Sequence, residues 1–179
     1  SRKYNVTLNV DGGAELEETI VKVTYNGKYT LPVPSEVGSG REGMKFNGWY
    51  SNPNGAGVQY TDNEGNSLGV YRDSKDVTLY AYWVDIFAYT LERDVEVQGK
   101  EAYVISKAPG FALVKKEEVV TIPAYYKGVR VQTVSAGAFK NCTNLTHLRI
   151  PNTVSIIETG LNGEISSAFE GCSNLVDVT

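Results

Sequence analysis

The first half of the chain alternates apolar and polar residues over short stretches that are separated by glycine, asparagine and proline. In YNVTLNV, residues 4–10, the apolar Val6, Leu8 and Val10 occupy every second position, which is the period of a strand with one buried face. Phe46 and Trp49 are expected to anchor the core of this region. Further strands are predicted at residues 19–25, 45–50 and 77–83, and a hairpin is predicted at residues 58–71 with its turn at residues 63–66.

The second half of the chain repeats itself. AFKNCTNLTHLRIP, residues 138–151, returns as AFEGCSNLVDVT at residues 168–179, and each shared residue recurs 30 positions later. A partial copy, VVTIP at residues 119–123, precedes HLRIP at residues 147–151 by 28 positions. The offset of 28 includes 5 inserted residues near AYYKG, 124–128, and the offset of 30 includes 7 inserted residues near TGLNGEI, 159–165. Without these insertions both offsets reduce to a period of 23. A fixed period in this range, with insertions confined to turns, is typical of a leucine-rich solenoid.

Stacked turns of such a solenoid place equivalent residues above one another. Leu145, Leu148 and Ile150 are expected to point into a continuous core, so the residues that alternate with Leu148 and Ile150 face outward. The outward columns are then Val119, His147 and Asp177 in one case, and Thr121, Arg149 and Thr179 in the other.

Two groups of residues are candidates for binding. We interpret His147, Arg149 and Asp177 as the exposed, binding-capable face of the array. Tyr125 and Tyr126 lie in the first insertion and are expected to offer further exposed contacts.

The motifs of the first half carry a family resemblance. YNVTLNVDGG, VTYNGKYTLPVP, MKFNGWYSNPNG and DVTLYAYWV follow one another in the order of the Listeria–Bacteroides repeat. Residues 1–84 resemble this family, the B-repeat of internalin-type bacterial surface proteins. The resemblance implies a small β-grasp-like module on a secreted or wall-attached protein.

The second half resembles a different family. AFKNCTNLTHLRIP is similar at each defined position to the BspA-type, or treponemal-type, leucine-rich repeat. The resemblance implies a module over residues 85–179, with a β-rich N-terminal cap at about 85–118 and repeats at 119–179. The whole chain is therefore expected to be mainly β, a β-grasp-like module followed by a short leucine-rich-repeat solenoid. The implied repeat core consists of Phe139, Cys142, Leu145, Leu148, Ile150, Phe169, Cys172 and Leu175.

The last copy of the repeat stops at Thr179, before its pattern is complete. We expect the repeats to continue in a longer protein. The chain is expected to be a monomer in solution, and the open edge of its last turn is expected to make contacts between chains.

Charge and composition exclude several classes of function. The formal net charge is −4 and no basic stripe is present, so nucleic-acid binding is not expected. No apolar run approaches the roughly 20 residues of a membrane span. Cys142 and Cys172 are expected to be free thiols in narrow core slots, because stacked side chains that point the same way are poorly placed for a disulfide; a disulfide is the alternative for an extracellular chain.

The sequence contains no recognisable catalytic arrangement. His147 is its only histidine and lacks an accompanying Ser or Cys motif, so we interpret it as a surface residue of the repeat. DNEGNS, residues 62–67, lacks the longer ligand series of an EF-hand and is interpreted as a turn. We therefore expect no enzymatic activity, no metal and no cofactor.

The two resemblances together imply a part of a bacterial cell-surface protein. Its expected role is attachment to a protein or glycan on a host or neighbouring cell. A purely structural spacer that displays a binding array is the alternative, and an enzyme of unknown class is a more distant one.

Overall fold

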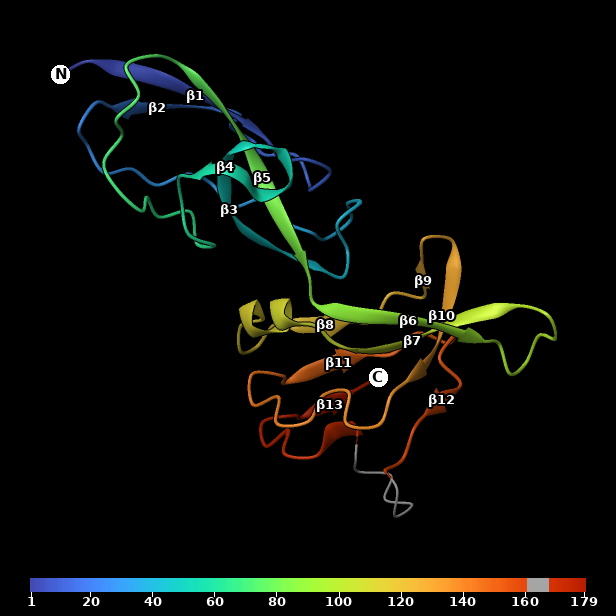
Figure 1. Cartoon of the computed structure of the whole chain (residues 1–179). Helices are drawn as coiled ribbons and strands as arrows, with labels where there is room; N and C mark the ends of the chain where they lie inside the picture. The colour runs from blue at the N-terminus through green and yellow to red at the C-terminus, as the bar shows by residue number, and fades with distance from the viewer. Residues whose placement is uncertain (161–167) are drawn as a thin grey trace. The chain divides into compact units, whose positions relative to one another are not determined.

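The computed structural model of the chain describes residues 1–160 and 168–179 and is mainly β (Figure 1). Backbone contacts divide the chain into an N-terminal unit, Ser1–Val84, and a C-terminal unit, Asp85–Thr179. Each unit has its own apolar core. The two units are described separately below.

The N-terminal unit is built on one five-stranded sheet with the strand order β2-β1-β5-β3-β4. β1 is parallel to β5 and antiparallel to β2, and β3 is antiparallel to β4. A short 3₁₀ turn, η1 (Pro53–Gly55), joins β3 to β4. The strands are β1 (Lys3–Asn9), β2 (Ile20–Thr24), β3 (Met44–Asn52), β4 (Ala56–Gln59) and β5 (Val77–Asp85).

The core of the N-terminal unit lies on one face of this sheet. Val6 and Leu8 of β1 pack there with Leu79, Ala81 and Trp83 of β5, as the alternation predicts. All five side chains are buried because they stand at alternate positions of two adjacent strands.

Phe46 and Trp49 are also buried, as predicted, although their spacing of three residues does not fit a regular strand. Gly48 lies between them with a φ of 104°, a backbone conformation that favours glycine. A Cβ at this position would lie 2.5 Å from the carbonyl oxygen of Thr61. The glycine therefore lets β3 change the face of its side chains and bury both aromatic rings.

The hairpin predicted at residues 58–71 is wrong in its second arm. Residues 68–71 form no strand; the loop closes through a bridge between Thr61 and Ser67 and through backbone hydrogen bonds from Asp62 to Asn66 and from Leu68 to Tyr60. The carboxylate of Asp62 adds to these backbone bonds, because it accepts hydrogen bonds from the backbone N–H groups of Glu64 and Asn66 and from the side chain of Asn66. These bonds tighten the turn at the tip of the loop.

The C-terminal unit contains two strand ladders, of which the first is parallel throughout and the second includes the antiparallel pairs β6–β7 and β9–β10. One is the three-stranded sheet β13-β11-β8. The other has the order β12-β10-β7-β6, with β9 paired to β10 off this path. The strands are β6 (Phe87–Arg93), β7 (Glu101–Lys107), β8 (Val119–Thr121), β9 (Tyr125–Tyr126), β10 (Val129–Val134), β11 (His147–Arg149), β12 (Ile156–Ile157) and β13 (Asp177–Val178), and η2 (Pro109–Leu113) is a 3₁₀ turn.

Strand register in both ladders follows the repeat. His147 lies opposite Val119 on one side and Asp177 on the other, which is the predicted column. In the second ladder Val134 lies opposite Ile157, 23 positions later, the period predicted after the insertions are removed. The first insertion forms β9 and the tight turn into β10. The second insertion, near residues 159–165, falls largely outside the described residues.

The core of the C-terminal unit stacks one turn of chain on the next. Phe111, Phe139 and Phe169 follow one another, and each neighbouring pair of ring centroids is 5.6 Å apart. Of the residues expected in the repeat core, Phe139, Cys142, Leu145 and Leu148 are buried, and Ile150, Phe169, Cys172 and Leu175 are partly buried against the same cluster.

Phe111 belongs to the same stack although it lies before the residues that the sequence assigns to the repeats. It stands on η2, within the segment expected to be a cap, and 28 positions before Phe139. Val114 likewise stands 28 positions before Cys142, and both are buried. The segment before β8 thus contributes a stacked turn of its own to the core.

Backbone conformation also recurs between turns. Asn141 and Gly171 are 30 positions apart and both have a left-handed φ, 59° and 73°. Asn144 donates from Nδ2 to the carbonyl oxygens of Phe111 and Val114, and Asn174 donates to that of Thr143. The asparagine of each turn therefore binds the backbone of the preceding turn.

Candidate functional site

The candidate binding face is the outward side of the ladder β8-β11-β13, with His147, Arg149 and Asp177 at its centre. Arg149 and Asp177 are exposed and His147 is half-buried. The backbone N–H of Ile150 donates to Thr179 (2.7 Å) and that of Ile122 donates to Arg149 (3.0 Å). These bonds hold adjacent strands in register, so the outward side chains are presented from a rigid backbone.

The ring of His147 is fixed by its neighbour. His147 Nδ1 and Thr146 Oγ1 are 3.0 Å apart, and the same hydroxyl accepts a hydrogen bond from the backbone N–H of Glu117. Thr146 is itself buried, so it ties the histidine to the turn beneath the strand. This arrangement supports a positioned surface imidazole.

Tyr125 and Tyr126 lie on β9, in the sheet of the second ladder and not in the sheet of the candidate binding face. Tyr125 is 62% exposed, as expected for a contact residue. Tyr126 is half-buried: its ring stacks on Tyr89 with centroids 3.7 Å apart and meets the edge of Tyr103 at 5.3 Å. The amine of Lys127 lies 5.2 Å from the centroid of the same ring. Tyr126 therefore anchors the inserted hairpin, and Tyr125 alone is well exposed.

An ionic network missed in the sequence fixes the turn between β6 and β7. Asp94 is 4% exposed and accepts two hydrogen bonds of 2.7 Å from Arg130 of β10. It also accepts bonds from Gln132 and from the backbone N–H groups of Glu96 and Val97. The Arg130 guanidinium, with these further donors, lowers the pKa of Asp94 to about 2. The carboxylate is occupied by donors of β10 and of its own turn, so we interpret the network as a structural link between these two segments.

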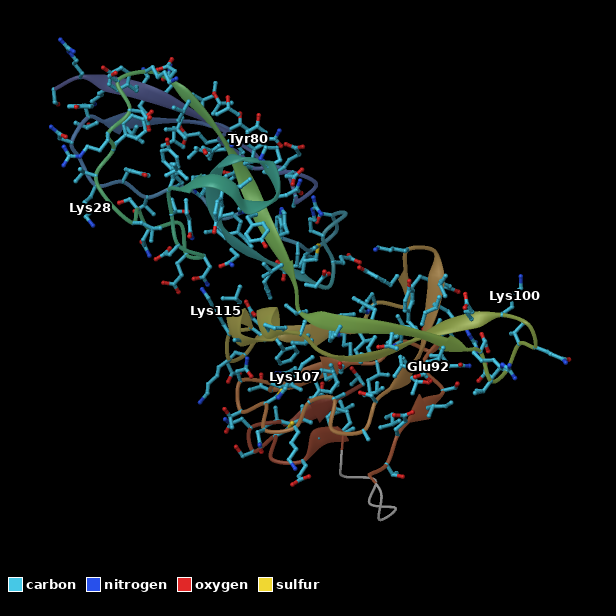
Figure 2. All side chains as sticks on the ribbon, viewed as in Figure 1. Lys28, Tyr80, Glu92, Lys100, Lys107 and Lys115 are labelled. Atoms are coloured by element: carbon cyan, nitrogen blue, oxygen red, sulfur yellow. The ribbon has the colours of Figure 1, made fainter. Side chains whose placement is uncertain are left out.

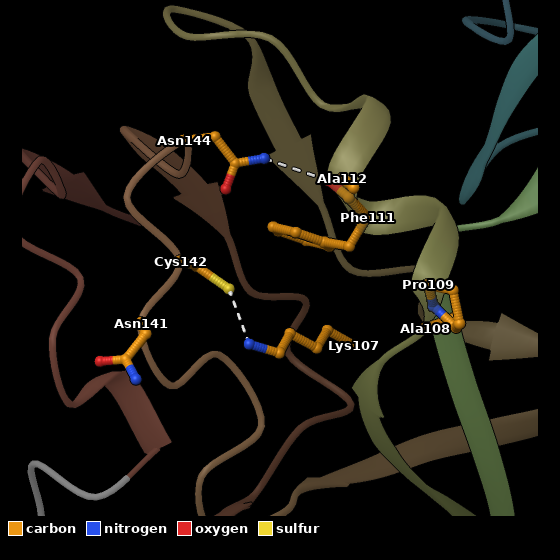
Figure 3. A pocket seen from close by; sticks show the side chains of 8 residues that line it. All are labelled: Lys107, Ala108, Pro109, Phe111, Ala112, Asn141, Cys142 and Asn144. Atoms are coloured by element: carbon orange, nitrogen blue, oxygen red, sulfur yellow. Dashed lines mark hydrogen bonds between the residues drawn. The ribbon is translucent and has the colours of Figure 1, made fainter.

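One cleft of the C-terminal unit has a volume of about 420 Å³ and lies beside η2 (Figure 3). Phe111, Cys142 and Asn144 line it, and the Lys107 amine reaches the thiol of Cys142 at 3.7 Å and the carbonyl oxygen of Lys140. Burial raises the pKa of the Cys142 thiol. Burial thus disfavours the thiolate, which is the form in which a cysteine acts as a nucleophile.

Both cysteines are free thiols in the structure. Cys142 is buried and Cys172 is half-buried, where its Sγ donates to the carbonyl oxygen of Phe139 at 2.9 Å. Burial also raises the pKa of Cys172. The two side chains therefore serve as small packing groups of successive turns.

A polar cleft of about 370 Å³ lies in the N-terminal unit. Tyr60, Asp73 and Asp76 line it, and the hydroxyl of Tyr60 donates to Asp73 Oδ2 at 2.6 Å. Burial and this bond raise the pKa of Tyr60, so the phenol stays protonated as a donor. The aspartates are part of the fold, because Asp76 also accepts two hydrogen bonds from Asn5.

Neither metal ligation nor membrane spanning has support among residues 1–160 and 168–179. This part of the chain contains no group of three or more His, Cys, Asp and Glu side chains that could hold an ion. It also contains no helix with the length and apolar character needed to cross a membrane.

At Asp62 burial raises the pKa, but hydrogen bonds from Asn66 and Glu64 outweigh it and lower the pKa. The turn interpretation of residues 62–67 accounts for that carboxylate.

Comparison with known proteins bears on the N-terminal unit. No curated protein matches the chain. The resemblance of the first half to the Listeria–Bacteroides repeat is confirmed by a family match that spans nearly all of this unit. Residues 4–82 match the Listeria-Bacteroides repeat domain, a non-enzymatic module found in bacterial surface proteins.

Proposed function

We propose that the chain is a non-catalytic part of an extracellular bacterial surface protein, in which the C-terminal unit binds a protein or glycan on a host or neighbouring cell. The N-terminal unit supports the location, because its family occurs in bacterial surface proteins. The binding role is assigned to the ladder β8-β11-β13 of the C-terminal unit.

The proposed fold of the N-terminal unit is β-grasp-like. Its strand order β2-β1-β5-β3-β4, with β1 and β5 parallel at the centre, supports this assignment. The core residues of β1 and β5 all lie on one face of the sheet, which leaves the opposite face open to solvent or a partner.

The proposed fold of the C-terminal unit is a BspA-type leucine-rich-repeat solenoid. Three observations support it: the phenylalanines that stack at offsets of 28 and 30 residues, the asparagines that bind the preceding turn, and the parallel pairing of β8-β11-β13 and of β7-β10-β12. In such arrays each turn contacts only its neighbours, and ligands bind along the exposed face of several turns.

The observation that carries the binding proposal is the column Val119, His147 and Asp177 on adjacent strands of one rigid sheet. Strands in a sheet are about 4.8 Å apart, so this column and the neighbouring Arg149 present apolar, cationic and anionic groups within one small area. Mixed surfaces of this kind suit the polar ligands displayed on cells, whereas a buried apolar ligand would need a deep cavity.

The test is a direct binding measurement. The chain is applied to arrays of mammalian and bacterial glycans and to immobilised extracellular-matrix proteins, and retained binding is measured by surface plasmon resonance. The double variant His147→Ala with Arg149→Ala should lower binding at least tenfold if both side chains touch the ligand, since hot-spot residues each contribute 2 kcal/mol or more. Arg93→Ala removes an exposed arginine from β6, outside the candidate binding face, and should leave binding unchanged.

The result that would contradict the proposal is equal binding by the double variant and the wild type. A loss of binding in Arg93→Ala as large as in the double variant would also contradict it, because general positive charge would then account for retention.

A structural spacer is the second candidate. The parallel pair β1–β5, which joins the first and last strands of the N-terminal unit, favours it. Replacing the N-terminal unit by an unrelated folded domain should then preserve ligand binding in solution and cell attachment alike. If the N-terminal unit binds a ligand itself, the replacement will abolish that binding.

A further inference from the structure

The first and last strands of the N-terminal unit are direct neighbours. β1 and β5 pair in parallel from Val6 opposite Val77 to Asn9 opposite Tyr80, and Tyr80 is labelled on β5 in Figure 2. Because the strands are parallel, the chain enters β1 at one end of the pair and leaves β5 at the other, as Figure 1 shows. Tension along the chain therefore pulls the two strands in opposite directions along their common axis.

Side chains fasten this pair at both of its ends. At the start, the backbone N–H of Asn5 donates to Asp76 Oδ1 at 2.8 Å, and Asn5 Nδ2 donates to Asp76 Oδ2 at 3.1 Å. At the far end, Trp83 Nε1 donates to the carbonyl oxygen of Val10 at 2.9 Å, and this bond is buried. Both fasteners join the β1 segment to the β5 segment, so sliding one strand past the other breaks them.

Neither strand lies at an edge of the sheet. β1 lies between β2 and β5, and β5 lies between β1 and β3. Val6, Leu8, Leu79 and Ala81 interlock beneath the pair and are all nearly inaccessible to solvent. Displacement of β1 along its axis must therefore disrupt two ladders and the core together.

The direction of the force decides how these bonds break. In a parallel ladder the hydrogen bonds are evenly spaced, so a force along the strands loads all of them at once. A force that lifts one end of a strand away from its neighbour breaks the same bonds one after another. Unfolding under force is governed by the unfolding rate and not by the equilibrium stability alone.

We propose that the N-terminal unit is a tension-resisting element, in which the β1–β5 pair and its two fasteners set the barrier to forced unfolding. This function concerns the N-terminal unit alone and does not depend on ligand binding by the C-terminal unit. It suits a module that transmits force between an anchor and a site of attachment.

The experiment pulls the full chain in two directions with optical tweezers. Handles are attached through genetically encoded azido amino acids, because Cys142 and Cys172 would react with thiol reagents. In the shear geometry the handles are at Ser1 and at the exposed Ala88, which lies on β6 three residues after the end of β5. In the peeling geometry they are at Ser1 and at the exposed Lys28, just after β2, which is labelled in Figure 2.

The expected result is a several-fold higher unfolding force in the shear geometry at the same loading rate. In the peeling geometry Lys3 separates from Thr24 first and the remaining pairs of β1 follow in turn. Equal forces in the two geometries would overturn the proposal. This comparison leaves β1, β5 and both fasteners unaltered, so it does not depend on the folding of a destabilised variant.

Variants then locate the barrier. Asp76→Ala removes both bonds to Asn5, and at a fixed force in the shear geometry it should speed unfolding roughly tenfold, as expected for hydrogen bonds to a charged group. Trp83→Phe retains an aromatic ring but loses the bond to Val10, and it should speed unfolding roughly fivefold.

The matched control is Asp62→Ala. Asp62 also accepts several hydrogen bonds, but they all belong to its own loop and do not join β1 to β5. This variant should lower the equilibrium stability and leave the unfolding rate in the shear geometry nearly unchanged, since its contacts are not broken at the barrier. If Asp62→Ala speeds unfolding as much as Asp76→Ala does, the barrier lies outside the β1–β5 pair and the proposal is wrong.

Discussion

The phenylalanine stack of the C-terminal unit permits a quantitative prediction. Phe139 has no exposed surface, and its ring lies 5.6 Å from both Phe111 and Phe169, measured between centroids. Phe87 meets the same ring edge-on at 6.3 Å. Phe139→Ala therefore removes the central ring of the stack and leaves a cavity with phenylalanine on three sides.

The expected cost follows from the loss of a buried ring. Replacing a buried phenylalanine by alanine typically lowers the free energy of unfolding by about 3–5 kcal/mol. Phe139→Leu keeps most of the apolar volume and should cost about 1.5 kcal/mol or less. Because domains of this size have a total stability of about 5–15 kcal/mol, the alanine variant should bring the C-terminal unit close to unfolding.

The two units can be followed separately in one sample. Both tryptophans, Trp49 and Trp83, belong to the N-terminal unit, so tryptophan fluorescence reports on that unit. Hydrogen exchange with mass spectrometry reports on the peptides of the C-terminal unit. In urea, Phe139→Ala should lower the midpoint of the C-terminal unit by about 1 M or more, and the fluorescence midpoint should not move.

Two results would refute this reasoning. If Phe139→Ala costs no more than Phe139→Leu, the ring is not a packed member of a stack. If the fluorescence transition shifts together with the exchange of the C-terminal unit, the two cores do not unfold separately.

The remaining predictions concern three local features of the C-terminal unit. The pKa of Asp94 is lowered to about 2 from an ordinary 3.8, so its stabilising contribution is complete above pH 4 and is lost as the pH falls from about 4 to about 2. The difference in free energy of unfolding between the wild type and Asp94→Asn, measured in urea, should therefore shrink over that window. Gly171→Ala should lower the free energy of unfolding by more than the roughly 1 kcal/mol expected for Gly99→Ala. Both glycines have a left-handed φ, but only at Gly171 would a Cβ meet another side chain, the Oδ1 of Asn141 at 2.2 Å. Equal losses of stability in chemical denaturation would contradict the close contact. Tyr126→Ala should lower the stability by about 2 kcal/mol through loss of its stacked ring, and Tyr125→Ala should lower it by about 0.5 kcal/mol or less. The reverse order of the two losses in thermal unfolding would show that the exposed ring is the anchor.

Local periodicity and repeat spacing predicted most of the strand positions. Alternation identified Val6, Leu8 and Val10 as core residues, because this strand buries one of its faces. The register of His147 with Val119 and Asp177 followed from the spacing of the repeated phrases alone. Such features depend only on residues that are close in sequence or that recur at a fixed interval.

Features that depend on single side chains were not predictable in this way. Phe111 was missed because its turn has Glu117 where later turns have leucine, so the repeat pattern is incomplete there. The bonds between Asp94 and Arg130 join residues 36 positions apart and have no periodic signal. The hairpin predicted around Asp62 is shorter than expected: its turn is held by the Asp62 carboxylate and by a bridge between Thr61 and Ser67, and no strand follows.

The pairing of β1 with β5 has a consequence for how the N-terminal unit forms during synthesis. Val6 pairs with Val77, which is synthesised 71 residues later. The centre of the sheet is therefore the last part to be completed as the chain emerges. Contacts of such long sequence separation slow folding, because the intervening chain must be ordered before they form. During synthesis, the sheet of the N-terminal unit therefore cannot close until β5, the last strand of that unit, has emerged.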